Sequence, residues 1–163
     1  MISTQSFASD GHRHILEWGS FGNIEPGQFN LAQQIAVDDE RNIYVADTGS
    51  SKIQKFTNDG KFLSSWGING DEDGELQSPT GIAIYENDVY VVDEKQNIVQ
   101  KFDADGNFIL KWGEFGIENS QFNHPKGITI DSNGIIYIAD SKNHRIQTFT
   151  SDGEFLSSFG KYG

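Results

Sequence analysis

The sequence contains no cysteine and only three prolines. The lack of cysteine excludes disulfides, thiolate nucleophiles and cysteine-ligated zinc. With 18 glycines beside so few prolines, the composition suits many short strands joined by tight turns. No segment carries the i, i+3, i+4 apolar stripe of an amphipathic helix, so we expect essentially no helix.

Basic residues and long apolar runs are also scarce. The chain has 12 Lys and Arg against 24 Asp and Glu, a formal charge of −12, which would repel a phosphate backbone. No run approaches the roughly 18 apolar residues of a membrane span. Residues 1–11 have neither a charged n-region nor an apolar h-region, so we expect no signal peptide in this sequence. These absences argue against nucleic-acid and membrane partners.

The chain does contain an internal repeat. The stretch 42–67 returns as 88–113 and again as 134–160. Each copy belongs to a unit with four short strand-like runs, which in the first unit are residues 34–37, 43–46, 52–56 and 62–66. A repeat of ~40–50 residues with alternating β-branched and aromatic residues is typical of propeller blades.

Residues 1–22 match the second half of such a unit, because Trp18 and Gly19 align with Trp66 and Gly67. A single four-stranded sheet cannot cover both of its apolar faces, so the units are expected to stack side by side. The sequence therefore predicts an all-β fold, a single partial propeller of four-stranded antiparallel blades. Its expected parts are a half blade at 1–22 and full blades at 31–67, 78–113 and 124–160.

The repeated motif resembles the NHL repeat. It runs P-x-G-I-x-(I/V), (I/V)-Y-(V/I)-(A/V)-D, (R/K)-I-Q-(K/T)-F, D-G-x-F and (W/F)-G, and residues 124–160 are the closest copy. The first unit departs most, since Ala32 and Gln34 stand at the places of Pro79 and Gly81. The resemblance implies a β-propeller, commonly of about six blades. Some NHL domains bind RNA through a basic face, which the acidic balance here opposes.

At ~46 residues per blade, six blades would need roughly 280 residues. An open arc of fewer blades leaves two apolar blade faces in water, which favours association. We therefore expect either a fragment of a longer propeller or a homo-oligomer, and we favour self-association.

In a propeller, the linkers between units and the turns between the second and third runs share one rim, and we expect a protein partner there. Aromatic rings in the repeated (W/F)-G-x-(F/Y)-G element are good contact anchors, although they could instead pack back against the adjacent blade. The candidate binding residues are Phe21, Phe115, Tyr162, Gln33, Thr80, Lys126 and His144.

Three recurring aspartates, Asp47, Asp93 and Asp140, end the second run of each unit. They could form a ring of carboxylates on the rim. An aspartate that enters a tight turn more commonly accepts hydrogen bonds from nearby backbone N–H groups, so we expect an architectural role.

Metal sites have weak support in the sequence. Asn69, Asp71 and Asp73 place oxygen side chains at alternate positions with a glycine at the sixth, as at the start of a calcium loop. However, Thr80 stands where that loop needs a bidentate glutamate, so a solvated acidic linker is the alternative. The chain has four histidines, and their spacing does not bring them together as zinc ligands: His12, His14, His124 and His144. We expect no cofactor.

The peptidyl-hydroxyglycine amidating lyases are similar propellers, and the resemblance places their metal histidines just after the proline position. Here those places hold Gln33, Thr80 and Lys126. Our leading hypothesis is therefore a non-catalytic propeller scaffold for protein interaction or self-assembly. The alternative is a propeller-type hydrolase or lyase with a metal site near the axis.

Overall fold

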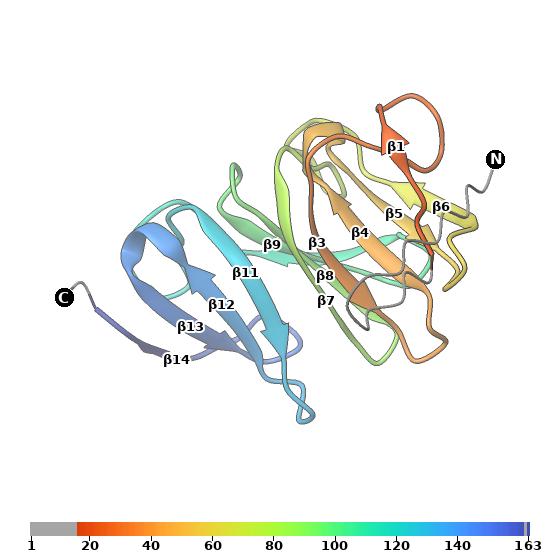
Figure 1. The fold of residues 1–163 in the computed structure, drawn as a ribbon. Helices are drawn as coiled ribbons and strands as arrows, with labels where there is room; N and C mark the ends of the chain where they lie inside the picture. The colour runs from red at the N-terminus through yellow and green to blue at the C-terminus, as the bar shows by residue number, and fades with distance from the viewer. Residues whose placement is uncertain (1–15, 162) are drawn as a thin grey trace, which may run out of the picture.

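The computed structural model describes residues 16–161 and 163. It contains three four-stranded antiparallel sheets, each built from four consecutive strands, which confirms the predicted all-β class. The sheets follow one another in chain order from orange through green to blue (Figure 1). Most of the predicted half blade lies outside the described residues, as do Tyr162, His12 and His14.

We call the sheets blade 1, blade 2 and blade 3. Blade 1 comprises β3 (Ala32–Val37), β4 (Ile43–Asp47), β5 (Lys52–Phe56) and β6 (Phe62–Trp66). Blade 2 comprises β7 (Pro79–Tyr85), β8 (Asp88–Asp93), β9 (Ile98–Phe102) and β10 (Phe108–Trp112). Blade 3 comprises β11 (Pro125–Ile130), β12 (Ile136–Asp140), β13 (Arg145–Phe149) and β14 (Phe155–Phe159). The four runs predicted for the first unit agree with β3 to β6 within two residues at each end.

The smaller elements lie in the linkers and turns. A two-residue parallel pair, β1 (Ser20–Phe21) and β2 (Gln28–Phe29), closes the linker before blade 1. Single parallel bridges, Asn69 with Leu76 and Phe115 with Phe122, close the next two linkers in the same way. Within the described ranges the only helical turns are the 3₁₀ turns η1 (Thr48–Ser50) and η2 (Ser141–Asn143), and no helix there is long and apolar enough to cross a membrane.

The Asp-Gly turns between the third and fourth strands need glycine for two reasons. Gly106 has φ +87°, in the left-handed region that side chains other than glycine rarely adopt. A Cβ atom on Gly106 would also lie 2.6 Å from the ring of Trp66 in the preceding blade. The predicted hairpin turns are therefore also sites of contact between blades.

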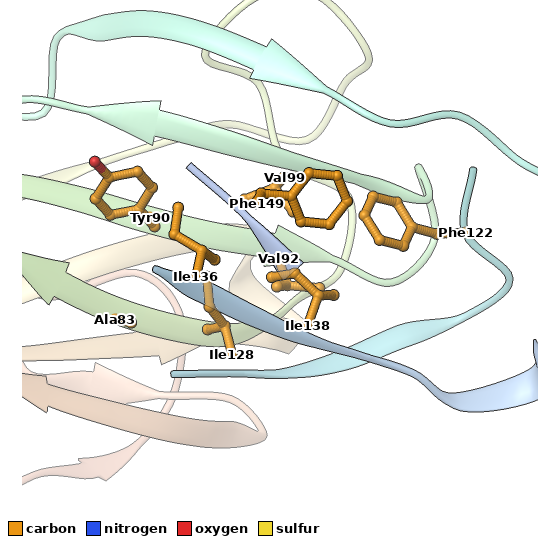
Figure 2. Packing of buried hydrophobic residues seen from close by; sticks show 9 residues of the cluster. All are labelled: Ala83, Tyr90, Val92, Val99, Phe122, Ile128, Ile136, Ile138 and Phe149. Carbon is orange, nitrogen blue, oxygen red and sulfur yellow. The ribbon is translucent and has the colours of Figure 1, made fainter. Parts of the chain in front are cut away.

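The hydrophobic core lies between the blades. Figure 2 shows the cluster between blade 2 and blade 3, where Tyr90, Val92 and Val99 meet Ile136, Ile138 and Phe149. A second cluster of the same kind joins blade 1 to blade 2. Because each sheet buries one face against the next, a blade depends on its neighbours for its core.

We define two faces for each blade from these clusters. The trailing face packs on the following blade: Ala36, Tyr44, Ala46, Ile53 and Trp66 in blade 1, and Ala83, Tyr90, Val92, Val99 and Trp112 in blade 2. The leading face packs on the preceding blade: Ile82, Ile84, Val89, Val91 and Phe102 in blade 2, and Ile128, Ile130, Ile136, Ile138 and Phe149 in blade 3.

The first strands of blades 2 and 3 lie close together at Gly81. A Cβ atom there would lie 2.5 Å from the carbonyl oxygen of Lys126 on β11. The side chain of Gln34 on β3 accepts a hydrogen bond from Ile82 N (3.3 Å) and donates one to the Ile128 carbonyl (3.4 Å). One amide thus connects the innermost strands of all three blades.

Candidate functional site

The linkers before each blade and the turns between second and third strands lie along one edge of the sheets, as the sequence predicts. Asn143 donates to the Gly116 carbonyl at 2.8 Å, and Gln96 donates to the Gly70 carbonyl at 2.8 Å. We call this edge the rim. It comprises linkers 20–30, 68–77 and 114–124 and turns 48–51, 94–97 and 141–144.

The recurring aspartates are buried inside the rim and serve as hydrogen-bond acceptors. Asp93 accepts from the backbone N–H groups of Gln77 at 2.7 Å, Ser78 at 3.0 Å, Lys95 at 3.1 Å and Gln96 at 3.0 Å. Because this carboxylate is fully buried and surrounded by donors, it holds the linker and the turn together. The architectural interpretation is confirmed, and a solvent-facing carboxylate ring is not formed.

Asp47 and Asp140 do the same with a different mixture of donors. Asp47 accepts from Asn30 N at 2.7 Å and from the Gln54 amide at 3.0 Å. Asp140 accepts from Asn123 N at 2.7 Å and pairs with the Arg145 guanidinium at 2.8 Å. Each aspartate therefore fixes the linker that precedes its own blade.

Three buried glutamines, which the sequence reasoning missed, complete this arrangement. The Gln100 side chain accepts from Gly74 N at 3.0 Å and donates to the Glu75 carbonyl at 2.6 Å. Gln54 and Gln147 make the same pair of bonds to the linkers before blades 1 and 3. The signal that could have found them is the glutamine repeated in the third run of every unit, where neighbouring positions are apolar.

Large apolar side chains stand in solvent along the linkers. Phe21 is 87 % exposed and Phe115 is 67 % exposed, so these rings do not pack back against a blade. Six apolar side chains are each at least 65 % exposed, more than any other large apolar side chain among the described residues. Five lie in the linkers and Leu31 directly follows the first linker: Phe21, Ile24, Leu31, Ile68, Phe115 and Ile117.

Among the other predicted binding residues, Gln33, Thr80 and Lys126 lie on the first strands of the blades, and His144 lies in a turn of the rim. Gln33 is exposed on β3, and the buried Thr80 hydroxyl donates to the Lys126 carbonyl at 3.3 Å. Lys126 pairs with Glu94 at 3.5 Å, and His144 is exposed at the end of η2 with φ +55°. Their role in binding stays a prediction.

The acidic loop of blade 2 is occupied by contacts within the chain. Asp73 pairs with Lys111 at 2.9 Å, and Glu75 accepts from Glu72 N at 3.2 Å. Within residues 16–161, no group of three or more His, Asp or Glu side chains is placed to hold a metal ion. The calcium candidate at Asn69, Asp71 and Asp73 stays a prediction, and Asp73 is already paired with Lys111.

A shallow hollow lies between blades 1 and 2 on the edge opposite the rim, and its groups bind one another. Lys55 lies over the Tyr44 ring at 4.9 Å and donates to the Ala104 carbonyl at 3.2 Å. Burial by itself raises the pKa of Asp38, but hydrogen bonds from Asn42 and Tyr44 outweigh it and hold that pKa below its ordinary 3.8. Burial, followed by the bond to Asp38, raises the pKa of Tyr44. Of these contacts, the bond from Lys55 to Ala104 connects blade 1 to blade 2, and the others lie within blade 1.

Stacked four-stranded sheets with a shared rim define the class of the chain, which is a β-propeller segment. Solved propellers of low identity show the same fold. A streptogramin B lyase matches with a TM-score of 0.63 at 20 % identity, covering 79 % of this chain and 40 % of that one. A catalytically inactive virginiamycin B lyase from Staphylococcus aureus with quinupristin matches with a TM-score of 0.65 at 18 % identity, covering 93 % and 46 %.

The repeat itself also matches known sequences. The sequence model of the NHL repeat matches residues 29–56 and 122–149, which include the first three strands of blade 1 and of blade 3. Protein brain tumor of Drosophila melanogaster is 37 % identical over 71 residues, which are 44 % of this chain and 7 % of that protein. The chain therefore contains NHL repeats at these two positions, and it spans less than half the length of these relatives.

Proposed function

We propose that the chain is a non-catalytic NHL-repeat scaffold that binds a protein partner through the rim and also associates with itself. The observation that carries this proposal is the set of solvent-exposed apolar side chains on successive linkers, Phe21 and Phe115 above all. Exposed aromatic rings on a rigid support are the residues that most often anchor protein interfaces.

The linker backbone gives these side chains a fixed position. Gln100 and Asp93 hold the linker before blade 2 through its backbone atoms, and Gln147 and Asp140 hold the linker before blade 3. A preorganised contact loses less conformational entropy on binding than a mobile one. The rim therefore resembles a set of loops on a firm framework, which suits recognition.

Support for the rival function, a metal-dependent hydrolase or lyase, is weaker. The places where the amidating lyases carry histidines hold an exposed glutamine, a buried threonine whose hydroxyl is hydrogen-bonded, and a lysine paired with Glu94. Gln34 also lies across the innermost strands, close to where an axial site would be built.

A peptide selection tests the binding proposal. Random 12-residue peptides displayed on phage are selected against the purified chain, and the affinities of the recovered peptides are measured by fluorescence anisotropy. We expect Phe115→Ser and Phe21→Ser to weaken binding at least tenfold. The matched control Leu156→Ser, on the outer strand β14 and also exposed, should leave affinity unchanged.

If the selected peptides bound both rim variants with unchanged affinity, the rim would not be the contact face. The catalytic rival is tested separately by measuring metal content after purification. Stoichiometric zinc, calcium or iron that survives dialysis would support the rival over the scaffold.

A further inference from the structure

The two junctions between blades repeat one pairing, position by position. Ile53, Val99 and Ile146 lie opposite Trp66, Trp112 and Phe159 in their respective sheets. Trp66 packs on Phe102 of the next blade with ring centroids 6.0 Å apart, and Trp112 packs on Phe149 at 5.8 Å. The pattern assigns every blade a trailing face and a leading face, whether or not a neighbouring blade covers them.

Blade 1 has a leading face that is only half covered. Its equivalents of Ile82 and Ile84 are Ile35 and Val37, since Ile35 pairs with Val45 as Ile82 pairs with Val91. Ile82 is 1 % exposed, whereas Ile35 is 62 % and Val37 is 56 % exposed. Among residues 16–161, the inner half of this face lacks the partner that blade 1 itself provides for blade 2.

Blade 3 has the complementary defect. Phe159 takes the place of Trp66 and Trp112 and is 55 % exposed. Tyr137 and Ala139, at the places of Tyr90 and Val92, are only partly buried, whereas Tyr90 and Val92 are fully buried. Tyr137 and Ala139 on this face match the tyrosine and small aliphatic residues of both internal junctions, whereas phenylalanine replaces tryptophan at Phe159.

We propose that the trailing face of blade 3 docks on the leading face of blade 1 in a second copy of this chain. The contact would repeat the internal junction, with Tyr137 and Ala139 over Ile35 and Val37 of the second copy. The contact is heterologous, because it joins two different surfaces. Two copies would therefore close a ring of six four-stranded sheets only if the curvature of the three stacked blades brings both ends together. The inference rests on the self-association in the proposed function and adds the surfaces and their orientation.

Trp18 is the competitor within the chain. Its ring stacks on Phe56 at 4.6 Å, the place that Phe159 of the second copy would take, because Trp18, Trp66 and Phe159 are equivalent. The second copy must therefore displace Trp18 from the outer half of the face. Lys55 in blade 1 and Lys101 in blade 2 each bond to the following blade, and Thr148 stands at the equivalent position in blade 3. The proposed contact between copies therefore lacks one interaction of the internal junctions.

Sedimentation velocity over a hundredfold range of concentration tests this contact on the full chain. We expect wild type to shift from monomer to dimer as concentration rises. Ile35→Asp and Phe159→Asp should each raise the dissociation constant at least fiftyfold. Because both side chains are exposed in the monomer, these variants should fold, as circular dichroism can check. Leu63→Asp, on the outer strand of blade 1 and also exposed, is the matched control and should associate like wild type.

Mixing distinguishes a head-to-tail contact from other modes of association. The Ile35→Asp variant has an unaltered trailing face on blade 3, and the Phe159→Asp variant has an unaltered leading face on blade 1. An equimolar mixture should therefore form dimers, although each variant alone stays monomeric. Trp18→Ala should lower the dissociation constant of the otherwise unaltered chain.

A chain that stays monomeric across the range, or association that persists in both aspartate variants, overturns the inference. If Phe159→Asp still associates and Ile35→Asp does not, the contact is symmetric between the blade 1 faces of two copies, which also overturns the inference. Phe115→Ser should leave dimer formation unchanged, so failure of the rim proposal and failure of this one give different results.

Discussion

Blade 2 and blade 3 carry nearly the same motif, yet their third strands are buried to different extents. All five residues of β9 in blade 2 are buried, whereas only Gln147, Thr148 and Phe149 are buried in β13 of blade 3. Within the part of the chain that the structure describes, blade 2 has a blade on both sides, and blade 3 has one on its leading side. The motif fixes the strand, and the neighbouring blade decides how much stability the strand contributes.

The largest expected effect tests this difference with two phenylalanines. Phe102→Ala should lower the free energy of unfolding by about 4 kcal/mol, because it leaves a cavity in the junction between blades 1 and 2. Phe159→Ala should cost less than about 1 kcal/mol, because the ring is half exposed. Urea unfolding at low protein concentration measures both. Equal losses would show that the trailing face of blade 3 is covered in solution.

The rim aspartates provide a second contrast. Asp93→Ala should cost about 3 kcal/mol, because four backbone N–H groups lose their buried acceptor and cannot turn away. Asp140→Ala should cost about 2 kcal/mol, since the Arg145 side chain can rotate towards water.

Thermal unfolding followed by circular dichroism orders the two aspartate variants. Asp105→Ala, in an exposed turn, is the control and should stay within about 0.5 kcal/mol of wild type. A larger loss for Asp140→Ala than for Asp93→Ala would contradict the distinction between backbone and side-chain donors.

The contacts between blades at the opposite edge are weaker. Lys101 is 2.9 Å from Asp88 and donates to the Ser151 carbonyl of blade 3 at 3.3 Å, with its side chain only 9 % exposed. Lys101→Met should therefore cost about 1–2 kcal/mol. Lys111→Met removes a solvent-exposed pair with Asp73 and should cost at most about 0.5 kcal/mol. If the two variants unfolded at the same urea concentration, the Lys101 contact would not contribute to the stability of the junction.

The smallest expected effect is on the stability of the chain at acidic pH. Hydrogen bonds from the Asn107 side chain, and then from its backbone, hold the pKa of Asp103 below its ordinary 3.8. Its contribution to stability is therefore present above pH 3.8 and is lost as the pH falls through the lower pKa of the folded state. Thr150 holds the same place in blade 3 and does not titrate; it accepts from Glu154 N at 3.1 Å.

Asp103→Thr should make the turn of blade 2 resemble that of blade 3. We expect a flatter fall of the unfolding free energy between about pH 4 and pH 2, with little change at pH 7. Urea unfolding at a series of pH values measures this. An acid profile identical to that of wild type would exclude Asp103 as a contributor.

The strands, the turns and the architectural aspartates could be predicted because each is a local pattern. Alternation of β-branched and aromatic residues determines the strands, and Asp-Gly fixes the hairpin turns, as at Gly106. Asp93 was assigned correctly because a carboxylate that enters a tight turn has backbone donors close in sequence. Repetition then confirmed each element two or three times.

The remaining features depend on residues far apart in the chain. Gln34 marked a departure from the repeat in the sequence, but its bridge to Ile82 and Ile128 spans three blades. The partners of Gln100 lie 25 and 26 residues earlier, in a linker without strand periodicity. The exposure of Phe115 depends on the path of its linker, which bonds from Gln147 and Asp140 hold over distances of 17 to 27 residues along the chain.

The glutamine and aspartate bonds to the linkers have a consequence for diversity. They bond to peptide N–H and carbonyl groups, which every residue except proline provides in full, so the path of each linker depends on its buried side chains, such as Leu76 and Phe122, and little on its exposed ones. Outward-facing positions such as Ile68 and Ile117 can therefore be replaced freely while the loops keep their shape. A library built at these positions would sample new surfaces on one unchanging frame.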